Sequence, residues 1–125
     1  MKISIVHSHR LTREVLVRTL SKRLNTEAVG FSCLEDLLSS SMDYDVFLVY
    51  NMFGRDKMDR WDGVKWIKHQ KPEALIVSVI HKRFFERKSS PPAADRITFV
   101  AEDDIEGLVK LVQNRQKQKL QSMSV

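Results

Sequence analysis

Three polar residues, His7, Ser8 and His9, stand together where the first apolar run of the chain ends. A third histidine, His81, follows the fourth apolar run, and Cys33 follows the second. Imidazole and thiolate groups bind Zn²⁺ or Cu²⁺, and histidine also changes charge near neutral pH. The spacing matches no known class of metal site, however. We therefore expect hydrogen-bonded histidines, with a pH-sensing histidine as an alternative, and no metal or other cofactor.

The same stretch lacks a phosphate-binding loop. An enzyme built on a parallel sheet would bind phosphate through a glycine-rich turn after its first strand. The residues at 7–12, HSHRLT, include a serine, an arginine and a threonine but no glycine. The chain also shows no nucleophile–base pair and no paired carboxylates at a spacing used in catalysis. The sequence therefore does not predict an enzyme.

Five apolar runs recur along the chain and are candidates for strands. The third and fourth, DVFLVY and ALIVSVI, are nearly continuous, as expected of strands buried on both faces of a parallel sheet. Strands alternating with helices predict a doubly wound, five-stranded parallel α/β sheet of the flavodoxin-like class, in the order 2-1-3-4-5. The runs lie at residues 3–7, 27–31, 45–50, 74–80 and 96–101.

The segments between these runs have helical patterns. In the second of them, residues 32–40, Glu35 follows Ser32 at the spacing of a capping box. The third is predicted to begin at Asp62 and to end before Pro72, and the last covers 103–115. Prolines interrupt residues 83–95, so the fourth helix is predicted to be short or irregular. In the first segment, the apolar residues at helical spacing are Leu11, Val15, Leu16, Leu20 and Leu24.

Composition describes one ordinary globular domain. Of the 125 residues, 42% are hydrophobic and 30% charged, which suits a chain with a single hydrophobic core. No apolar stretch is long enough for a membrane span and the first residues lack a signal peptide, so a cytoplasmic protein without membrane contacts is expected. The net charge of +5 is dispersed and accompanies no nucleic-acid motif, so this domain alone is not expected to bind DNA.

Two segments resemble a known family. Residues 5–16, IVHSHRLTREVL, are similar to the opening of NarL/FixJ-type response regulators, I-V-D-D-H-x-x-x-R-E-x-L. Residues 44–54, YDVFLVYNMFG, resemble the third strand of the family and the loop after it. The resemblance implies a receiver domain over residues 1–115, followed at 116–125 by a C-terminal tail or the start of a linker.

The residues that carry the chemistry of that family are replaced here. The resemblance implies two acidic Mg²⁺ ligands at the positions of His7 and Ser8, and a phospho-accepting aspartate at the position of Tyr50. A phenol cannot form an acyl phosphate, and it carries no charge at neutral pH. The sequence therefore predicts a pseudo-receiver that is not phosphorylated in the manner of the family.

Two further positions of the pocket depend on the register of the strands. The family carries a serine or threonine near the end of the fourth strand, which corresponds to Val79, or to Ser78 if the register is shifted by one. Its lysine at the end of the fifth strand corresponds to Ala101, or to Glu102 in the shifted register. Neither alternative supplies the lysine, so no counter-charge for a phosphoryl group is expected.

Two surfaces are predicted to contact partners, because the fourth helix, fifth strand and fifth helix form the signalling surface of the family. One is an aromatic pair flanked by basic residues, a combination enriched in interfaces. The other is the last helix, because the family commonly dimerises through faces of its first or its fifth helix. The predicted surface residues are Arg83, Phe84, Phe85, Arg87, Ile105, Leu108 and Val112.

Together these features predict a phosphorylation-independent regulatory module that binds a protein partner or forms a homodimer. NarL/FixJ-type proteins carry a helix-turn-helix domain after a linker, and the polar residues 113–125 are typical of a linker. DNA would then be contacted only through such a C-terminal domain, which would control transcription. The alternative is a stand-alone adaptor that binds a kinase or another regulator. A small-molecule ligand in the degenerate pocket has no support from the sequence.

Overall fold

The structure is a computed structural model, and it describes residues 1–41, 43–51, 60–80 and 97–123. The predicted fourth helix lies outside these ranges. The described elements are β1 (Lys2–Val6), α1 (Arg10–Leu24), β2 (Glu27–Phe31), α2 (Leu34–Leu38), β3 (Val46–Asn51), α3 (Arg60–Gln70), β4 (Leu75–Ile80), β5 (Ile97–Ala101) and α5 (Ile105–Met123).

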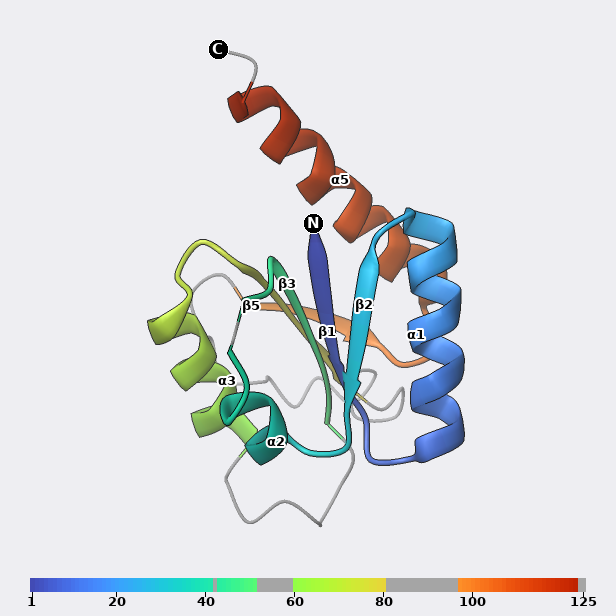
Figure 1. Ribbon diagram of the computed structural model, residues 1–125, viewed down its shortest axis with the longest axis vertical. Coiled ribbons are helices and arrows are strands. Elements are labelled where there is room, and N and C mark those ends of the chain that lie inside the picture. Colours follow the sequence, from blue (N-terminus) through green and yellow to red (C-terminus); the bar gives the residue numbers. More distant parts are fainter. Residues whose placement is uncertain (42, 52–59, 81–96, 124–125) are drawn as a thin grey trace.

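The five strands form one parallel sheet in the order β2-β1-β3-β4-β5. Figure 1 shows α1 and α5 on one face of this sheet and α2 and α3 on the other. The predicted doubly wound, flavodoxin-like α/β class is thereby confirmed. All strands end at the same edge, so the last residues of β1, β3 and β4 are neighbours there, where α/β proteins of this class bind ligands.

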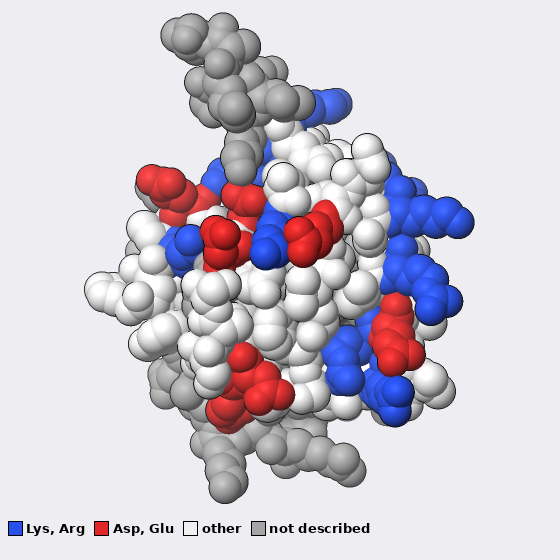
Figure 2. All heavy atoms as spheres, viewed as in Figure 1, with Lys and Arg blue, Asp and Glu red and all other residues white. Residues whose placement is uncertain are grey.

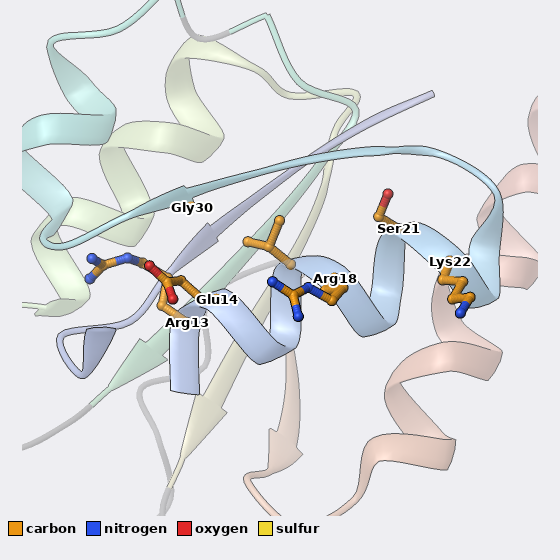
Figure 3. A pocket seen from close by; sticks show the side chains of 7 residues that line it. Arg13, Glu14, Arg18, Ser21, Lys22 and Gly30 are labelled. Atoms are coloured by element: carbon orange, nitrogen blue, oxygen red, sulfur yellow. The ribbon is translucent and has the colours of Figure 1, made fainter. Parts of the chain in front are cut away.

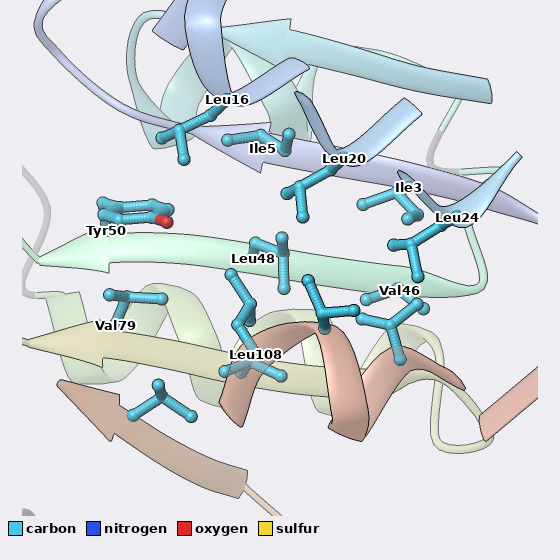
Figure 4. Close-up of a cluster of buried hydrophobic side chains, with 14 residues drawn as sticks. Ile3, Ile5, Leu16, Leu20, Leu24, Val46, Leu48, Tyr50, Val79 and Leu108 are labelled. Carbon is cyan, nitrogen blue, oxygen red and sulfur yellow. The ribbon is translucent and has the colours of Figure 1, made fainter. Parts of the chain in front are cut away.

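Two hydrophobic layers hold the helices on the sheet, because successive residues of a strand point to opposite faces. Under α1 and α5, Ile5 and Leu48 of the sheet pack with Leu20 of α1 and Leu108 of α5 (Figure 4). On the other face, α2 and α3 pack against β1, β3 and β4, and Phe47 is fully buried there. The strands β3 and β4 are therefore buried on both faces, as their nearly continuous apolar sequences predicted.

The first helix buries only part of its apolar residues. Leu16, Leu20 and Leu24 point into the core, whereas Leu11 is 67% exposed and Val15 is 62% exposed. The helical spacing was predicted correctly, but these two side chains lie on the outer side of α1 and do not contribute to the core.

The ends of two other helices differ from the predicted ones. Cys33, not Ser32, is the N-cap of α2, and its side chain makes no capping hydrogen bond. The Ser32 hydroxyl donates to the Asp36 carboxylate instead (2.9 Å), so the predicted capping box does not form. In α3 the first helical residue is Arg60, two positions before the predicted start.

The last helix continues through most of the segment that was predicted to be a tail or linker. It ends at Met123, and Figure 1 shows its last turns projecting past the edge of the sheet. An ion pair between Arg23 and Glu106 (2.7 Å) joins α1 to the first turn of α5. In the part of the chain that the structure describes, no helix combines the length and hydropathy needed to cross a membrane.

Candidate functional site

Two aromatic rings meet at the edge of the sheet where the strands end. His7 directly follows β1, and Tyr50 is the last but one residue of the neighbouring strand β3. Their ring centroids are 4.9 Å apart and their planes are tilted by 52°. His7 is 5% exposed and Tyr50 is 8% exposed, so the two rings pack against each other away from solvent.

The His7 ring is held by its neighbours in a neutral state. Its Nδ1 accepts a hydrogen bond from the backbone N–H of His9 (3.0 Å), which requires that this nitrogen be unprotonated. The Arg13 guanidinium donates to the His7 carbonyl (2.9 Å). Burial, His9 and Arg13 lower the pKa of His7, and Glu102 opposes them more weakly. This is the hydrogen-bonded histidine that the sequence predicted, and it supplies no negative charge for Mg²⁺.

Tyr50 places a neutral phenol at the end of β3. Burial is the main cause that raises the pKa of Tyr50 to about 12, and the Glu102 carboxylate adds to it. The buried hydroxyl has no hydrogen-bond partner among the described residues. Figure 4 shows the ring in the hydrophobic cluster beside Leu16 and Val79. Its position is therefore that of a core side chain and not of a metal ligand.

The strand register shows which neighbours share the face of Tyr50. Val79 lies opposite Tyr50 in the β3–β4 ladder and belongs to the same hydrophobic cluster. Ser78 is buried and, one residue earlier in the strand, points to the other face. Val79 thus occupies the place beside Tyr50.

The residue that directly follows β5 is acidic: it is Glu102. Ala101 ends the strand opposite Ile80, and the N–H of Glu102 donates to the Ile80 carbonyl (2.8 Å). The Glu102 carboxylate acts electrostatically on both His7 and Tyr50. The family has a lysine at this end of the strand, so the charge here has the opposite sign. Only the alternative register in the sequence pointed to Glu102.

The other described polar residues near this edge have separate structural roles. His9 caps α1 by accepting from the Thr12 N–H (3.3 Å), and Ser8 is exposed. Cys33 is partly buried, and burial raises the pKa of its thiol. No group of three His, Cys, Asp or Glu side chains that could hold a metal ion occurs among the described residues. His81 lies outside them.

The predicted interaction surfaces are placed only in part. Arg83, Phe84, Phe85 and Arg87 lie outside the described residues. Leu108 and Val112 are buried in the core beneath α5, and Ile105 is partly buried against it. These α5 side chains hold the helix on the sheet, so in this fold Leu108 and Val112 are not accessible to a partner.

Comparisons with known proteins rest on structure. No family model matches the sequence, and no curated protein matches it. The BeF3-activated DrrB receiver domain matches with a TM-score of 0.64 at 18% identity, over 96% of this chain and 97% of that one. A streptococcal redox sensor, from a family that evolved from two-component response regulators, matches with a TM-score of 0.74 at 17% identity over 98% of this chain.

RcsB from Salmonella enterica serovar Typhimurium, bound to promoter rprA, matches with a TM-score of 0.70 at 19% identity over 99% of this chain. The present chain spans 54% of the streptococcal protein and 66% of RcsB. At these identities the likeness establishes the fold. The chain has the fold of a response-regulator receiver domain.

Proposed function

We propose that this chain is an atypical receiver domain that regulates through protein contacts and is not phosphorylated. The observation that carries this proposal is the buried Tyr50 ring at the end of β3, beside a neutral His7. A receiver needs a carboxylate there to accept phosphate and acidic side chains to hold Mg²⁺. A phenol whose pKa is about 12 and a neutral imidazole provide neither.

The same replacement gives the domain a different kind of control. In a conventional receiver, phosphorylation shifts an equilibrium between two conformations. Here the packed ring pair holds one conformation, and a partner takes over the control. The streptococcal redox sensor, whose family evolved from response regulators, supports the idea that this fold can be used with another input.

Phosphotransfer is tested directly with a small phosphodonor. The full chain is incubated with acetyl phosphate and Mg²⁺ and its intact mass is measured, with the DrrB receiver domain as a positive control. We expect a phosphate adduct on the control and none on this chain. An adduct in good yield on this chain, at Tyr50 or at any aspartate, would contradict the proposal.

The output that we propose is dimerisation and control of transcription through a linked DNA-binding domain. RcsB, which has this fold over part of its length and binds a promoter, supports this reading. The alternative is a stand-alone adaptor without catalytic activity. The intact mass of the native protein separates the two, since a mass near 14.6 kDa favours the adaptor and a much larger one favours the transcription factor. Light scattering of the purified chain tests the dimer.

A further inference from the structure

We propose that the groove between α1 and the edge strand β2 binds a small molecule that carries two or more adjacent phosphate groups. The groove has a volume of about 760 Å³, which is within the range of small-ligand pockets. Residues of α1 form one wall, and Gly30 of β2 lies opposite them (Figure 3). The inference goes beyond the proposed function and does not depend on it, because neither residue of the ring pair lines the groove.

The wall that α1 supplies is basic. Arg18 and Lys22 are four positions apart, so they are neighbours one helical turn apart on the same side of α1. Neither has an ion-pair or hydrogen-bond partner among the residues that the structure describes. Glu14, the acidic residue of the lining, is paired with Arg10 at 3.2 Å. Figure 2 shows lysine and arginine side chains gathered on the side of the molecule where α1 lies.

A third cation, Arg13, lies at the end of the groove opposite Lys22 (Figure 3). Its side chain packs on Gly30, since a Cβ at position 30 would lie 2.9 Å from the Arg13 Cγ. Its guanidinium donates to the His7 carbonyl at 2.9 Å, and that oxygen carries no formal charge. Arg13 therefore adds to the positive potential in the groove, while Arg18 and Lys22 are the cations that make direct contacts.

The edge strand supplies a backbone donor on the other side of the groove. The carbonyl of Phe31 in β2 accepts from the His7 N–H (3.0 Å), so it points toward β1. Because the backbone groups of successive residues point to opposite edges of a strand, the Gly30 N–H points away from β1, to the open edge of the sheet. A glycine at this position also leaves the groove unobstructed, since it has no side chain.

Charge and spacing decide the kind of ligand. Three cations and one carboxylate line the groove, so an anion is favoured there. Side chains one helical turn apart have Cβ atoms about 5–6 Å apart, so Arg18 and Lys22 can each contact one of two adjacent phosphate groups. The guanidinium fork and the ammonium group both bind phosphate oxygens through charge-assisted hydrogen bonds. A ligand with a single phosphate would leave one of the two cations without a contact.

The test is isothermal titration calorimetry of the full chain with inorganic pyrophosphate, without Mg²⁺. We expect inorganic phosphate and malonate to bind at least about tenfold more weakly, because neither has two adjacent phosphate groups. ADP is titrated in parallel to distinguish the sources of the phosphates. Tighter binding of ADP would identify a nucleotide, and equal or weaker binding of ADP would identify inorganic pyrophosphate itself. In an NMR titration, the Gly30 amide resonance should shift as pyrophosphate binds.

Two pairs of substitutions locate the site. Arg18→Gln with Lys22→Gln should weaken pyrophosphate binding about tenfold or more, because it removes both direct cationic contacts. The matched control, Lys65→Gln with Lys68→Gln, removes the same charge from α3, on the other face of the sheet, and should leave the affinity within about twofold. Exchange of the two cations, Arg18→Lys with Lys22→Arg, keeps the charge and should retain most of the binding.

Circular dichroism establishes that each variant is folded. The proposal is supported if pyrophosphate binds saturably, the Gly30 amide shifts, and only the Arg18→Gln, Lys22→Gln variant loses affinity. It is overturned if neither pyrophosphate nor ADP binds the wild-type chain, if malonate binds as tightly as pyrophosphate, or if that variant and its control behave alike. A single-stranded oligonucleotide that binds the groove more tightly than ADP would also overturn it, because the ligand would then be a nucleic acid.

Discussion

At the scale of single residues, Tyr50 and His7 determine what the edge of the sheet can do. Both are buried, and each reaches a neutral state for a different reason: a phenol is neutral unless the pH is high, and His7 is kept unprotonated by burial and by neighbouring positive charges. Glu102, which directly follows β5, supplies a carboxylate that acts on both rings. The site therefore combines neutral rings with a negative charge, which disfavours a phosphoryl group.

The Tyr50 hydroxyl should contribute nothing favourable to stability. Because it is buried without a partner among the described residues, we expect Tyr50→Phe to leave the free energy of unfolding unchanged or to raise it by up to about 1 kcal/mol. Urea unfolding of the two proteins, with equal m values as the control, measures the difference. A loss of more than about 1 kcal/mol would mean that the hydroxyl makes a favourable contact.

His7 should make the protein less stable in mild acid. Its pKa in the folded protein lies below the ordinary value of 6.5, so the unfolded chain binds the proton more readily. The stability that the neutral ring contributes is complete above pH 6.5 and is lost as the pH falls from there through the folded pKa. Urea midpoints across this range should fall more steeply for the wild type than for His7→Asn, which retains an acceptor for the His9 amide. An NMR titration of His7 with a midpoint at or above 6.5 would contradict this account.

At the scale of elements, α1 carries most of what distinguishes this chain. It begins at an unusual cap, since the His9 side chain accepts the Thr12 N–H and the first turn contains no acidic residue. It then exposes Leu11 and Val15 and packs its other side on β2 and the core. A helix that is needed only for the core would have a polar outer side.

Replacing the cap should strengthen α1. Aspartate accepts backbone N–H groups well at the N-cap, and its charge interacts favourably with the helix dipole. We expect His9→Asp to raise the free energy of unfolding by about 0.5–1 kcal/mol and His9→Ala to lower it. Thermal unfolding of the three proteins checks this order. Equal stability of the aspartate and alanine variants would show that the side chain at position 9 does not cap the helix.

Gly30 should be required for the packing of α1 against β2. A Cβ there would lie 2.9 Å from the Arg13 Cγ and 3.1 Å from the Val17 Cγ2, which is too close for either to stay in place. We expect Gly30→Val to destabilise the protein by about 1–3 kcal/mol and Gly30→Ala by less. In a double-mutant cycle, Arg13→Ala should recover part of the Gly30→Ala loss, because it removes the clashing side chain. Strictly additive losses would count against this contact.

At the scale of the whole molecule, the sheet and its order could be predicted from the sequence, but several details of the site could not. A nearly continuous apolar run such as ALIVSVI is typical of a central strand of a parallel sheet, because both faces of such a strand are buried. Helical spacing, by contrast, did not tell Leu11 and Val15 apart from the core residues of α1, since that depends on how the helix is rotated on the sheet. The sequence left open whether Ala101 or Glu102 stands at the position of the family's lysine, because a shift of one residue exchanges the two faces of a strand. The lowered pKa of His7 depends first on its burial and then on His9 and Arg13, and the sequence alone shows neither the burial nor the contact of the Arg13 guanidinium with the His7 carbonyl.

We propose that this receiver fold has no working phosphoryl site, and an NMR titration with Mg²⁺ followed by beryllofluoride tests this proposal most directly. Beryllofluoride mimics a bound phosphoryl group and does not require chemical transfer, so a slow reaction cannot hide a competent site. We predict that the amide resonances of His7, Tyr50, Val79 and Glu102 do not shift with either addition. Saturable shifts at these residues that require both Mg²⁺ and beryllofluoride would contradict the claim.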